Sequence, residues 1–506
     1  MRTFIWLRRV WQAVFLGVFL FFVFATTASA IGGYDVEWFL ELDPLVAVST
    51  TLATRSFSHQ LWWAVPLIVV TLVFGRFFCG WMCPMGVLHH ALGFLGRSKK
   101  IQERAKANAF RPGWQKVKYF ILLGMLGAAA MGSLQIGWLD PIASTWRGLS
   151  TAVIPAASNT AYGLYQGERH FQGGVLITVV FLGALALNLI FPRLYCRVLC
   201  PLGALLGLLS KFSLFRVTKK LTVCTECNIC GADCQGAADP QGTVRVSECM
   251  VCFNCIEGKA CPKGALSFGF LPAPEASTTE VDLGRRRWIG AALAGVAAGP
   301  LMRASAGVDP RPEPKCIRPP GAVAERDFVA RCLKCGACMK ACPTGGLQPA
   351  INEGGFEGFW TPVLVPRIGS CELDCALCSN VCPTGALEPL TLLQRRGKLP
   401  EVEPVKIGSA AFDKGRCLPW AYDTECIVCE EVCPTAQKAI YFKLETVTVR
   451  DGSQKVLKRP YVDLALCVGC GTCESRCPVF DHAGVRVSSV GETRSATNRI
   501  VLGGKV

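Results

Sequence analysis

Histidine is scarce in this sequence, and the best-known motif for haem attachment is absent. The 506 residues include five histidines, which are His59, His89, His90, His170 and His482. None of them lies in the middle of a long apolar run, where the paired axial ligands of a membrane haem would stand. The sequence also has no C-x-x-C-H motif for covalent haem attachment. We therefore expect no haem.

Acidic residues are also few. The chain has 37 Asp and Glu against 53 Lys and Arg, which gives a formal charge of +16. The basic residues flank apolar runs and belong to no recognisable nucleic-acid-binding module. This placement indicates membrane topology instead, and we expect no nucleic-acid partner.

The cysteine count is odd, which excludes complete pairing in disulfides. There are 29 cysteines, and the chain is far longer than a small disulfide scaffold. Hydrophobic residues make up 51%, which excludes a disordered chain. The mean hydropathy of +0.35 predicts apolar spans.

Four apolar runs are long enough to cross a bilayer, at 10–27, 61–78, 117–136 and 174–191. The first also resembles a cleavable signal peptide that ends at residue 30, but we favour a retained span because an internal repeat requires it. The segment 97–118 holds eight Lys and Arg, which places it and the N-terminus in the cytoplasm.

The repeat consists of a span, Leu-Asp-Pro, a second span and C-x3-C-P. Its aspartates are Asp43 and Asp140, and its thiols are Cys79 with Cys83 and Cys196 with Cys200. Spacing i, i+4 puts each thiol pair on one helix face, as an extra metal or redox site would require. A tight helix exit beside proline is the structural alternative.

Two cysteine quartets follow the fourth span with the spacing of a bacterial two-cluster ferredoxin. In such spacing three close cysteines hold one cluster and the remote fourth belongs to its neighbour. The predicted ligand sets are Cys224, Cys227, Cys230 with Cys261, and Cys249, Cys252, Cys255 with Cys234.

Four further quartets lie in the last third of the chain, and each ends in Cys-Pro. Zinc ribbons use two separated C-x2-C knuckles, whereas these quartets favour iron–sulfur clusters. Six 4Fe–4S clusters are therefore expected in all, and Cys316 is expected to be no ligand. The last four sets are Cys332, Cys335, Cys338, Cys342; Cys371, Cys375, Cys378, Cys382; Cys417, Cys426, Cys429, Cys433; and Cys467, Cys470, Cys473, Cys477.

A weakly apolar segment joins the two halves. It begins with Arg285-Arg286-Arg287 and ends near Ala306, and it looks like a twin-arginine export signal. An ordinary fifth anchor or a surface helix is the alternative. If the segment crosses the membrane, either as an export signal or as an ordinary fifth anchor, residues 310–506 lie outside the cytoplasm, in the periplasm.

These observations predict a multi-domain membrane protein. Its fold class is a four-helix transmembrane domain plus α+β bacterial ferredoxin-like modules. The expected domains are a four-span membrane domain at 1–215, a cytoplasmic two-cluster ferredoxin at 216–270, a linker with signal or anchor at 271–309, and a periplasmic four-cluster domain at 310–506.

The chain resembles a natural fusion of two families. Residues 1–265 resemble the NapH/MauN-type membrane ferredoxins through the spans, both C-x3-C-P motifs and the two-cluster quartets. Residues 284–480 look like the NapG/MauM ferredoxin-type family through the arginine-led segment, Ile317 to Ala322, Thr361 to Arg367 and Cys417 to Pro434.

The resemblance implies electron transfer between the membrane quinol pool and a periplasmic reductase, dehydrogenase or c-type cytochrome in a bacterial inner membrane. It also implies that the first exported quartet pairs with the fourth, and the second with the third. Any quinol-oxidising activity would need proton-accepting groups near the span ends, and Asp43, Asp140 and His59 are the candidates. Two alternatives remain open, an assembly factor for a periplasmic metalloenzyme that uses the C-x3-C-P thiols, and a cytoplasmic oxidoreductase subunit.

Overall fold

The computed structural model describes most of the chain. The described residues are 3–27, 35–56, 62–93, 100–162, 170–242, 244–256, 261–270, 285–304, 315–398, 401–448 and 452–498. The quinol-site candidate His59 and the two ends of the predicted linker, at 271–284 and 305–309, lie outside these residues.

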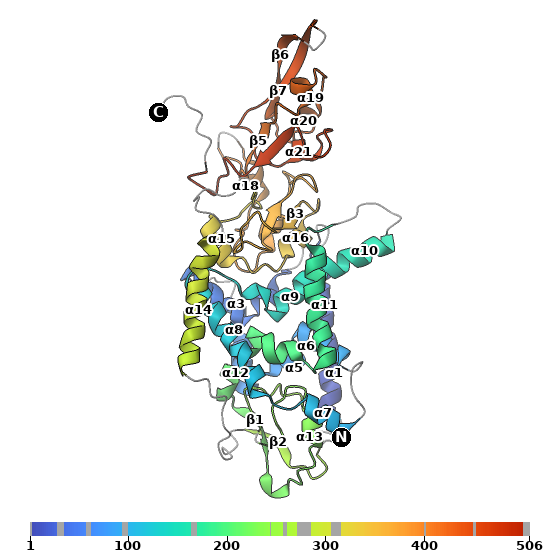
Figure 1. Cartoon of the computed structure of the whole chain (residues 1–506), viewed down its shortest axis with the longest axis vertical. Coiled ribbons are helices and arrows are strands. Elements are labelled where there is room, and N and C mark those ends of the chain that lie inside the picture. The colour runs from blue at the N-terminus through green and yellow to red at the C-terminus, as the bar shows by residue number, and fades with distance from the viewer. Residues whose placement is uncertain are drawn as a thin grey trace.

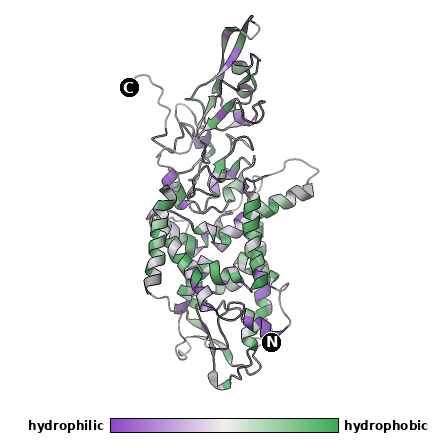
Figure 2. Ribbon diagram, viewed as in Figure 1, coloured by the Kyte–Doolittle hydropathy of each residue, from purple (hydrophilic) through white to green (hydrophobic). Residues whose placement is uncertain are grey.

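The molecule is elongated, with a helical domain in the middle and a cysteine-rich module at each end (Figure 1). The module at 215–270 lies at one end, beside the N-terminus, and residues 315–498 form the other. Apolar residues are concentrated in the middle of the molecule (Figure 2). The helix α14 (Arg285–Ala304) runs beside the helical domain and connects the two ends.

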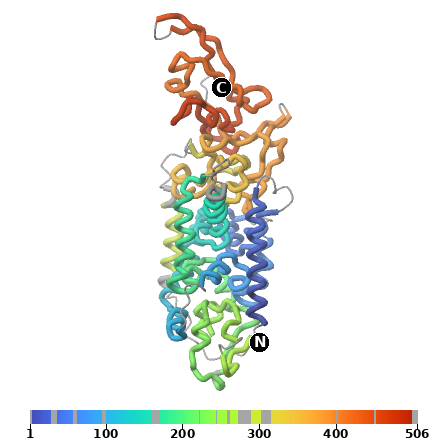
Figure 3. The backbone as a smooth tube through the Cα atoms, turned by 90° about the vertical axis from the view of Figure 1, so that its right-hand side faces the viewer, coloured from blue at the N-terminus to red at the C-terminus, as the bar shows by residue number. Residues whose placement is uncertain are grey.

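One helix, α1 (Thr3–Ala25), is long and apolar enough to cross a membrane among the described residues. It runs along the long axis of the molecule (Figure 3). Shorter apolar helices accompany it, including α4 (Ala64–Phe74) and α11 (Gly174–Ile190). The four full-length spans expected from the sequence are therefore not confirmed.

The expected span 61–78 is interrupted for a local reason. Helix α4 ends at Gly75, whose φ of 74° leaves the helical region, and Arg76 is also non-helical. The chain restarts as α5 (Phe77–Trp81) and again as α6 (Pro84–Leu92). A proline at the first helical position favours such a restart because its missing N–H would have no helical partner there.

The two halves of the repeat start short helices at equivalent residues. Asp43 and Asp140 cap α3 (Pro44–Thr54) and α9 (Pro141–Gly148), while Cys83 and Cys200 occupy the cap positions of α6 and α12 (Pro201–Leu209). The remaining helices of this region are α2 (Trp38–Glu41), α7 (Ile101–Ala107), α8 (Pro112–Ala130), η3 (Ile136–Trp138), η4 (Leu149–Val153), α10 (Ile154–Tyr162), η5 (Tyr195–Leu199) and η6 (Ser210–Phe212).

Helix α14 packs closely against α8 through glycines. A Cβ on Gly295 would stand 2.1 Å from the carbonyl oxygen of Gly124, and one on Gly127 would stand 2.8 Å from that of Ala292. Small residues permit such backbone approach between apolar helices. The arginine-led segment is therefore a helix docked on the helical domain in this structure.

The end modules contain short helices and two-stranded antiparallel sheets. At one end β1 (Phe215–Lys219) pairs with β2 (Leu266–Phe270) around η7 (Leu221–Val223) and α13 (Ile229–Ala232). At the other end the pairs are β3 (Leu347–Pro349) with β4 (Pro362–Leu364), β5 (Ser409–Phe412) with β8 (Val485–Ser488), and β6 (Ile440–Thr448) with β7 (Gln454–Val462). The helices there are α15 (Glu325–Arg331), α16 (Ala337–Ala341), α17 (Leu377–Asn380), α18 (Leu392–Arg396), α19 (Leu418–Ala421), α20 (Val428–Glu431) and α21 (Thr472–Ser475).

Candidate functional site

The small module at 215–270 gathers its eight cysteines into two groups. Cys224, Cys227, Cys230 and Cys261 line a single cavity. Burial raises the pKa of the Cys234 thiol, and the nearby thiols of Cys252 and Cys249 add to the shift. Cys255 likewise faces Cys252, Cys249 and Cys234. The structure thus brings together the two sets that the spacing predicts.

The first two quartets of the larger module exchange their fourth cysteines. Cys342, Cys371, Cys375 and Cys378 line one cavity. Burial raises the pKa of Cys335 to about 12, and the thiols of Cys382 and Cys332 add to the shift. Cys382 therefore completes the set of Cys332, Cys335 and Cys338.

The third and fourth quartets make the same exchange. Burial, with the nearby Cys426 and Cys477 thiols, raises the pKa of Cys417 to about 12. Burial also raises the pKa of Cys467, where Cys470 and Cys433 are the neighbouring thiols. The sets are thus Cys417, Cys426, Cys429 with Cys477, and Cys467, Cys470, Cys473 with Cys433.

The pairing implied by the family resemblance is therefore wrong. The structure pairs the first quartet with the second and the third with the fourth. The physical reason is that the connection after the first quartet folds back at once as the β3–β4 hairpin, which brings Cys371 beside Cys342. The two pairs then meet where the Cys371 N–H donates a 2.8 Å hydrogen bond to the carbonyl oxygen of Cys470.

The quartets have the donors that iron–sulfur clusters need. Thiols are their ligands, and N–H groups directed at the sulfurs help to set their potentials. Backbone N–H groups donate to Cys261 from Ala265 at 3.1 Å, to Cys234 from Ala238 at 3.3 Å and to Cys477 from Gly484 at 3.4 Å. Among the described residues, no three Cys, His, Asp or Glu side chains are gathered closely enough for a single metal ion.

Cys316, which belongs to no quartet, lies apart from these groups. Its side chain is buried and packs with Ala350 and Val363 in a small apolar cluster. Burial raises the pKa of this thiol to about 11. A buried, protonated thiol in apolar surroundings is chemically inert.

A ligand loop of the small module inserts into the helical domain. The indole N–H of Trp81 donates to the Val251 carbonyl at 2.9 Å, and Arg8 donates to that of Cys252 at 2.5 Å. A Cβ on Gly80 would stand 2.3 Å from the Met250 carbonyl oxygen. The loop around Cys249 and Cys252 therefore lies directly against the first C-x3-C-P motif.

A ligand loop of the larger module contacts the opposite end of the helical domain. Arg147 Nη1 donates to the carbonyls of Gly137 and Lys334, both at 2.9 Å. Lys334 Nζ donates to Gln135 Oε1 at 2.5 Å. A Cβ on Gly137 would stand 1.8 Å from the Leu333 carbonyl oxygen, so only glycine fits at this contact.

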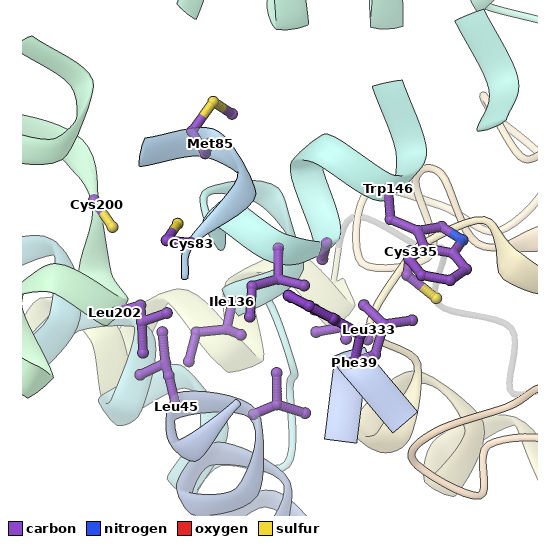
Figure 4. Close-up of a cluster of buried hydrophobic side chains, with 14 of the residues drawn as sticks. Phe39, Leu45, Cys83, Met85, Ile136, Trp146, Cys200, Leu202, Leu333 and Cys335 are labelled. Atoms are coloured by element: carbon purple, nitrogen blue, oxygen red, sulfur yellow. The ribbon is translucent and has the colours of Figure 1, made fainter. Parts of the chain in front are cut away.

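Between these two loops lie the repeated motifs. The four C-x3-C-P thiols, Cys79, Cys83, Cys196 and Cys200, are mutual neighbours. One apolar cluster contains Cys83, Cys196 and Cys200 and continues to Trp146 and Cys335 of the larger module. Figure 4 shows Cys83 and Cys200 on one side of this cluster and Cys335 beside Trp146 on the other.

The two repeat aspartates face each other in the buried interior. Asp43 Oδ1 accepts from the Leu45 N–H at 2.7 Å, and Asp140 Oδ2 accepts from the Ala143 N–H at 2.7 Å. The other carboxyl oxygens, Asp43 Oδ2 and Asp140 Oδ1, are buried and have no hydrogen-bond partner among the described residues, and the two carboxyls are close enough to interact electrostatically. Two neighbouring buried carboxyls are costly to ionise together, so the pair is a candidate proton acceptor.

Sequence reasoning missed a buried ion cluster next to the thiols. Glu248 accepts from Lys118 Nζ, from Arg76 Nη1 at 3.3 Å and from the Tyr119 hydroxyl at 3.0 Å. The sequence did carry a signal for this cluster, because Arg76 and Lys118 fall inside the predicted spans. A charged residue within an apolar span is a functional candidate by default.

Three parts of the chain match family models. Residues 61–102 with 173–220 match a 4Fe-4S binding domain, residues 331–386 match a 4Fe-4S dicluster domain, and residues 460–480 match a 4Fe-4S binding domain. The dicluster match spans the first two quartets of the larger module, which the structure pairs. The comparison with solved structures found no match to the chain.

Curated relatives extend these matches. The methylamine utilization ferredoxin-type protein MauM of Paracoccus denitrificans is 36% identical over 39% of this chain and 80% of its own length. YccM of Escherichia coli, named as an electron transport protein, is 30% identical over 42% of this chain and 56% of its own length. The regulatory protein NosR of Pseudomonas aeruginosa is 29% identical over 44% of this chain and 27% of its own length. The cysteine sets, the cluster-domain matches and the extent of the MauM likeness show that the chain belongs to the MauM ferredoxin-type family and is an iron–sulfur electron transport protein.

Proposed function

We propose that the chain conducts electrons across a bacterial inner membrane, between the quinol pool and a periplasmic redox partner. The observation that carries this proposal is the position of two ligand loops. The loop around Cys249 and the loop around Cys335 contact opposite ends of one helical domain. When bound, the clusters supply one-electron exchange.

The proposed topology places the small module in the cytoplasm and residues 310–506 in the periplasm, with the helical domain crossing the membrane between them. The excess of Lys and Arg at 97–118 supports this orientation. Helix α14 supports it too, because it connects the two ends alongside the helical domain (Figure 1). Protease added to spheroplasts should cut residues 310–506 and spare the small module. Protection of both modules would contradict this orientation.

A cavity at the outer end of the helical domain is our proposed quinol site. Its volume is about 160 Å³, and its lining is largely apolar, with Leu139, Ile177 and Phe181 beside Tyr195 and Arg147. An apolar cavity with a few convergent polar groups is the usual form of a small-molecule site. Helix α11 forms one wall, and its outward residues Val179 and Leu182 are exposed, as residues facing lipid would be.

The acidic pair lies near this cavity. Asp140 is close enough to Tyr195 to affect its hydroxyl, and Tyr195 also lines the cavity. Oxidation of a quinol releases protons along with electrons, and two neighbouring buried carboxyls are suited to accept a proton transiently. His59, the third sequence candidate, remains a prediction.

Quinol-driven reduction of the purified protein tests the proposal. Anaerobic addition of a reduced quinol should bleach the cluster absorbance. Ala184→Trp, which fills the cavity, should raise the KM for quinol and leave the iron content unchanged. Ala186→Trp is the matched control, because Ala186 is exposed on the same helix. A fully loaded protein that no quinol reduces would contradict the proposed donor.

A further inference from the structure

The four C-x3-C-P thiols remain outside the six predicted clusters. They come from two distant parts of the chain, yet each lies within electrostatic reach of the others. Cys83, Cys196 and Cys200 are buried, and Cys79 is half-buried. We infer that Cys79, Cys83, Cys196 and Cys200 hold a seventh iron–sulfur cluster, of the 4Fe–4S class, inside the helical domain.

The local backbone favours thiolate ligands at two of these positions. Cys83 and Cys200 precede the first residues of α6 and α12, which have nine residues each. The Gly203 N–H donates to Cys200 Sγ at 3.2 Å. Helix N-termini stabilise negative charge through their free N–H groups. The repeat therefore directs two helix starts at the same group of sulfurs.

The surrounding charges also favour an anion. The fully buried Arg76 gives Nη1 to the Ser247 carbonyl at 2.9 Å and to Glu248 at 3.3 Å, but its Nε and Nη2 have no hydrogen-bond partner among the described residues. A Cβ on Gly203 would stand 2.8 Å from Nη2 and 3.4 Å from Cys200 Sγ, which places this unpartnered donor beside the sulfur.

Two more cations stand at the same place. Arg193 Nη1 donates to the Cys79 carbonyl at 3.2 Å, and Lys118 pairs with Glu248. Glu248 pairs with Arg76 and Lys118, and Arg193 adds a third cation to this buried region, where uncompensated charge is costly. A cluster bound by four thiolates is anionic and would offset this excess, whereas protonated thiols or disulfides would not.

A third observation comes from the sequence comparison. The segments 61–102 and 173–220 together match one 4Fe-4S binding domain. The cysteines within them are Cys79, Cys83, Cys196 and Cys200. As in the six quartets, the four side chains are not gathered closely enough for a single metal ion.

The position of the group gives it a role, which deepens the electron-conduit function proposed above. The first motif contacts the loop of Cys249 and Cys252, and the apolar cluster around Cys83 and Cys200 reaches Cys335. A cluster here would accept and pass on one electron at a time between the two end modules, with no bond or proton exchanged.

The test is an iron and acid-labile sulfide count on the anaerobically purified full chain. We expect about four more iron atoms per chain than six clusters hold. The double variant Cys83→Ser with Cys200→Ser should lose about four iron atoms. Cys316→Ser is the matched control and should lose none, while Cys332→Ser should show the loss expected for one cluster of the larger module.

A second measurement needs no variant, so it remains valid if the double variant fails to fold. The wild-type protein is denatured in acid, alkylated without reductant and analysed by mass spectrometry. Iron sufficient for only six clusters, or a disulfide within either C-x3-C-P motif, would overturn the inference. The iron count is independent of the electron donor, so failure of quinol to reduce the protein would leave this inference intact and affect only the proposed function.

Discussion

At the scale of single residues, the repeat aspartates have two separable roles. Each caps a helix through one carboxyl oxygen, while its other oxygen is buried without a hydrogen-bond partner among the described residues. Asparagine caps helices about as well as aspartate, but it cannot exchange a proton. Replacement of each aspartate by asparagine therefore tests proton transfer separately from helix capping.

We predict that Asp43→Asn and Asp140→Asn slow quinol oxidation without loss of iron or of thermal stability. The reason is that each replaces one of the two neighbouring buried carboxyls, the proposed proton acceptors, with an amide. Stopped-flow reduction by quinol measures the effect, and dithionite reduction is the control, since it needs no proton acceptor in the protein. Unchanged quinol kinetics in both variants would exclude the pair from the reaction.

Glu325 is a residue whose contribution depends on pH. Burial alone would raise its pKa, but Arg318 Nη2 at 2.5 Å and Arg494 Nη1 at 2.8 Å outweigh burial and lower the pKa to about 2. Its ordinary value is 4.5. The ion pair therefore stabilises the folded module fully above pH 4.5 and loses this effect as the pH falls towards 2.

We predict that Glu325→Gln weakens the stability of the larger module at neutral pH and flattens its dependence on pH between 4.5 and 2. Anaerobic denaturant unfolding at several pH values measures this. Glu401→Gln is the control, because Glu401 pairs with Lys398 on the exposed surface, where an ion pair contributes little. Parallel pH profiles for Glu325→Gln and the wild type would contradict the assignment.

At the scale of elements, the most predictable features were those that depend on the spacing of residues along the chain. Two strand-like runs on either side of Asp451-Gly452 predict a hairpin, and the pairing of β6 with β7 confirms it. The division of the small module's eight cysteines into two ligand sets followed from their spacing along the chain. The interrupted helices were not predictable from average hydropathy, because Gly75 and Arg76 end α4 through local backbone conformation within an apolar run.

The α8–α14 contact was also invisible in the sequence, because it depends on which glycines come to face each other. We predict that Gly295→Leu destabilises the helical domain by about 1–3 kcal/mol, since the added side chain meets the Gly124 backbone. Gly290→Leu is the matched control, as a Cβ there meets nothing within 4 Å. Thermal aggregation in detergent compares the two, and equal behaviour would argue against tight packing.

At the scale of the whole molecule, the pairing of the quartets was predictable only in part. The sequence shows which cysteines are close along the chain, but the partner of each Cys-Pro cysteine depends on how the connections fold. The β3–β4 hairpin decides it for the first pair. The resulting series runs from the Cys335 set at the helical domain through the Cys371 and Cys467 sets to the Cys417 set.

The contact of Gln135 and Arg147 with the Lys334 loop joins the helical domain to the larger module. We call this contact the joint, and it depends on Arg147. Its guanidinium lies 4.4 Å from the centre of the Trp360 ring and donates to Lys334. We predict that Arg147→Ala slows electron passage into the larger module while all clusters remain, because the Lys334 loop loses its anchor. Arg459→Ala on the distant β7 strand is the control, and flash-initiated reduction followed by absorbance compares them. Equal rates would show that the joint does not depend on this contact.

Helix α14 has a consequence for how strong that joint must be. A covalent connection keeps the larger module at a high effective concentration beside the helical domain, of the order of millimolar for a short linker. Contacts that would be too weak to hold two separate proteins can then suffice. The joint of Gln135, Arg147 and Lys334 can therefore open and reclose without the loss of a subunit, and the two modules are always made in equal number.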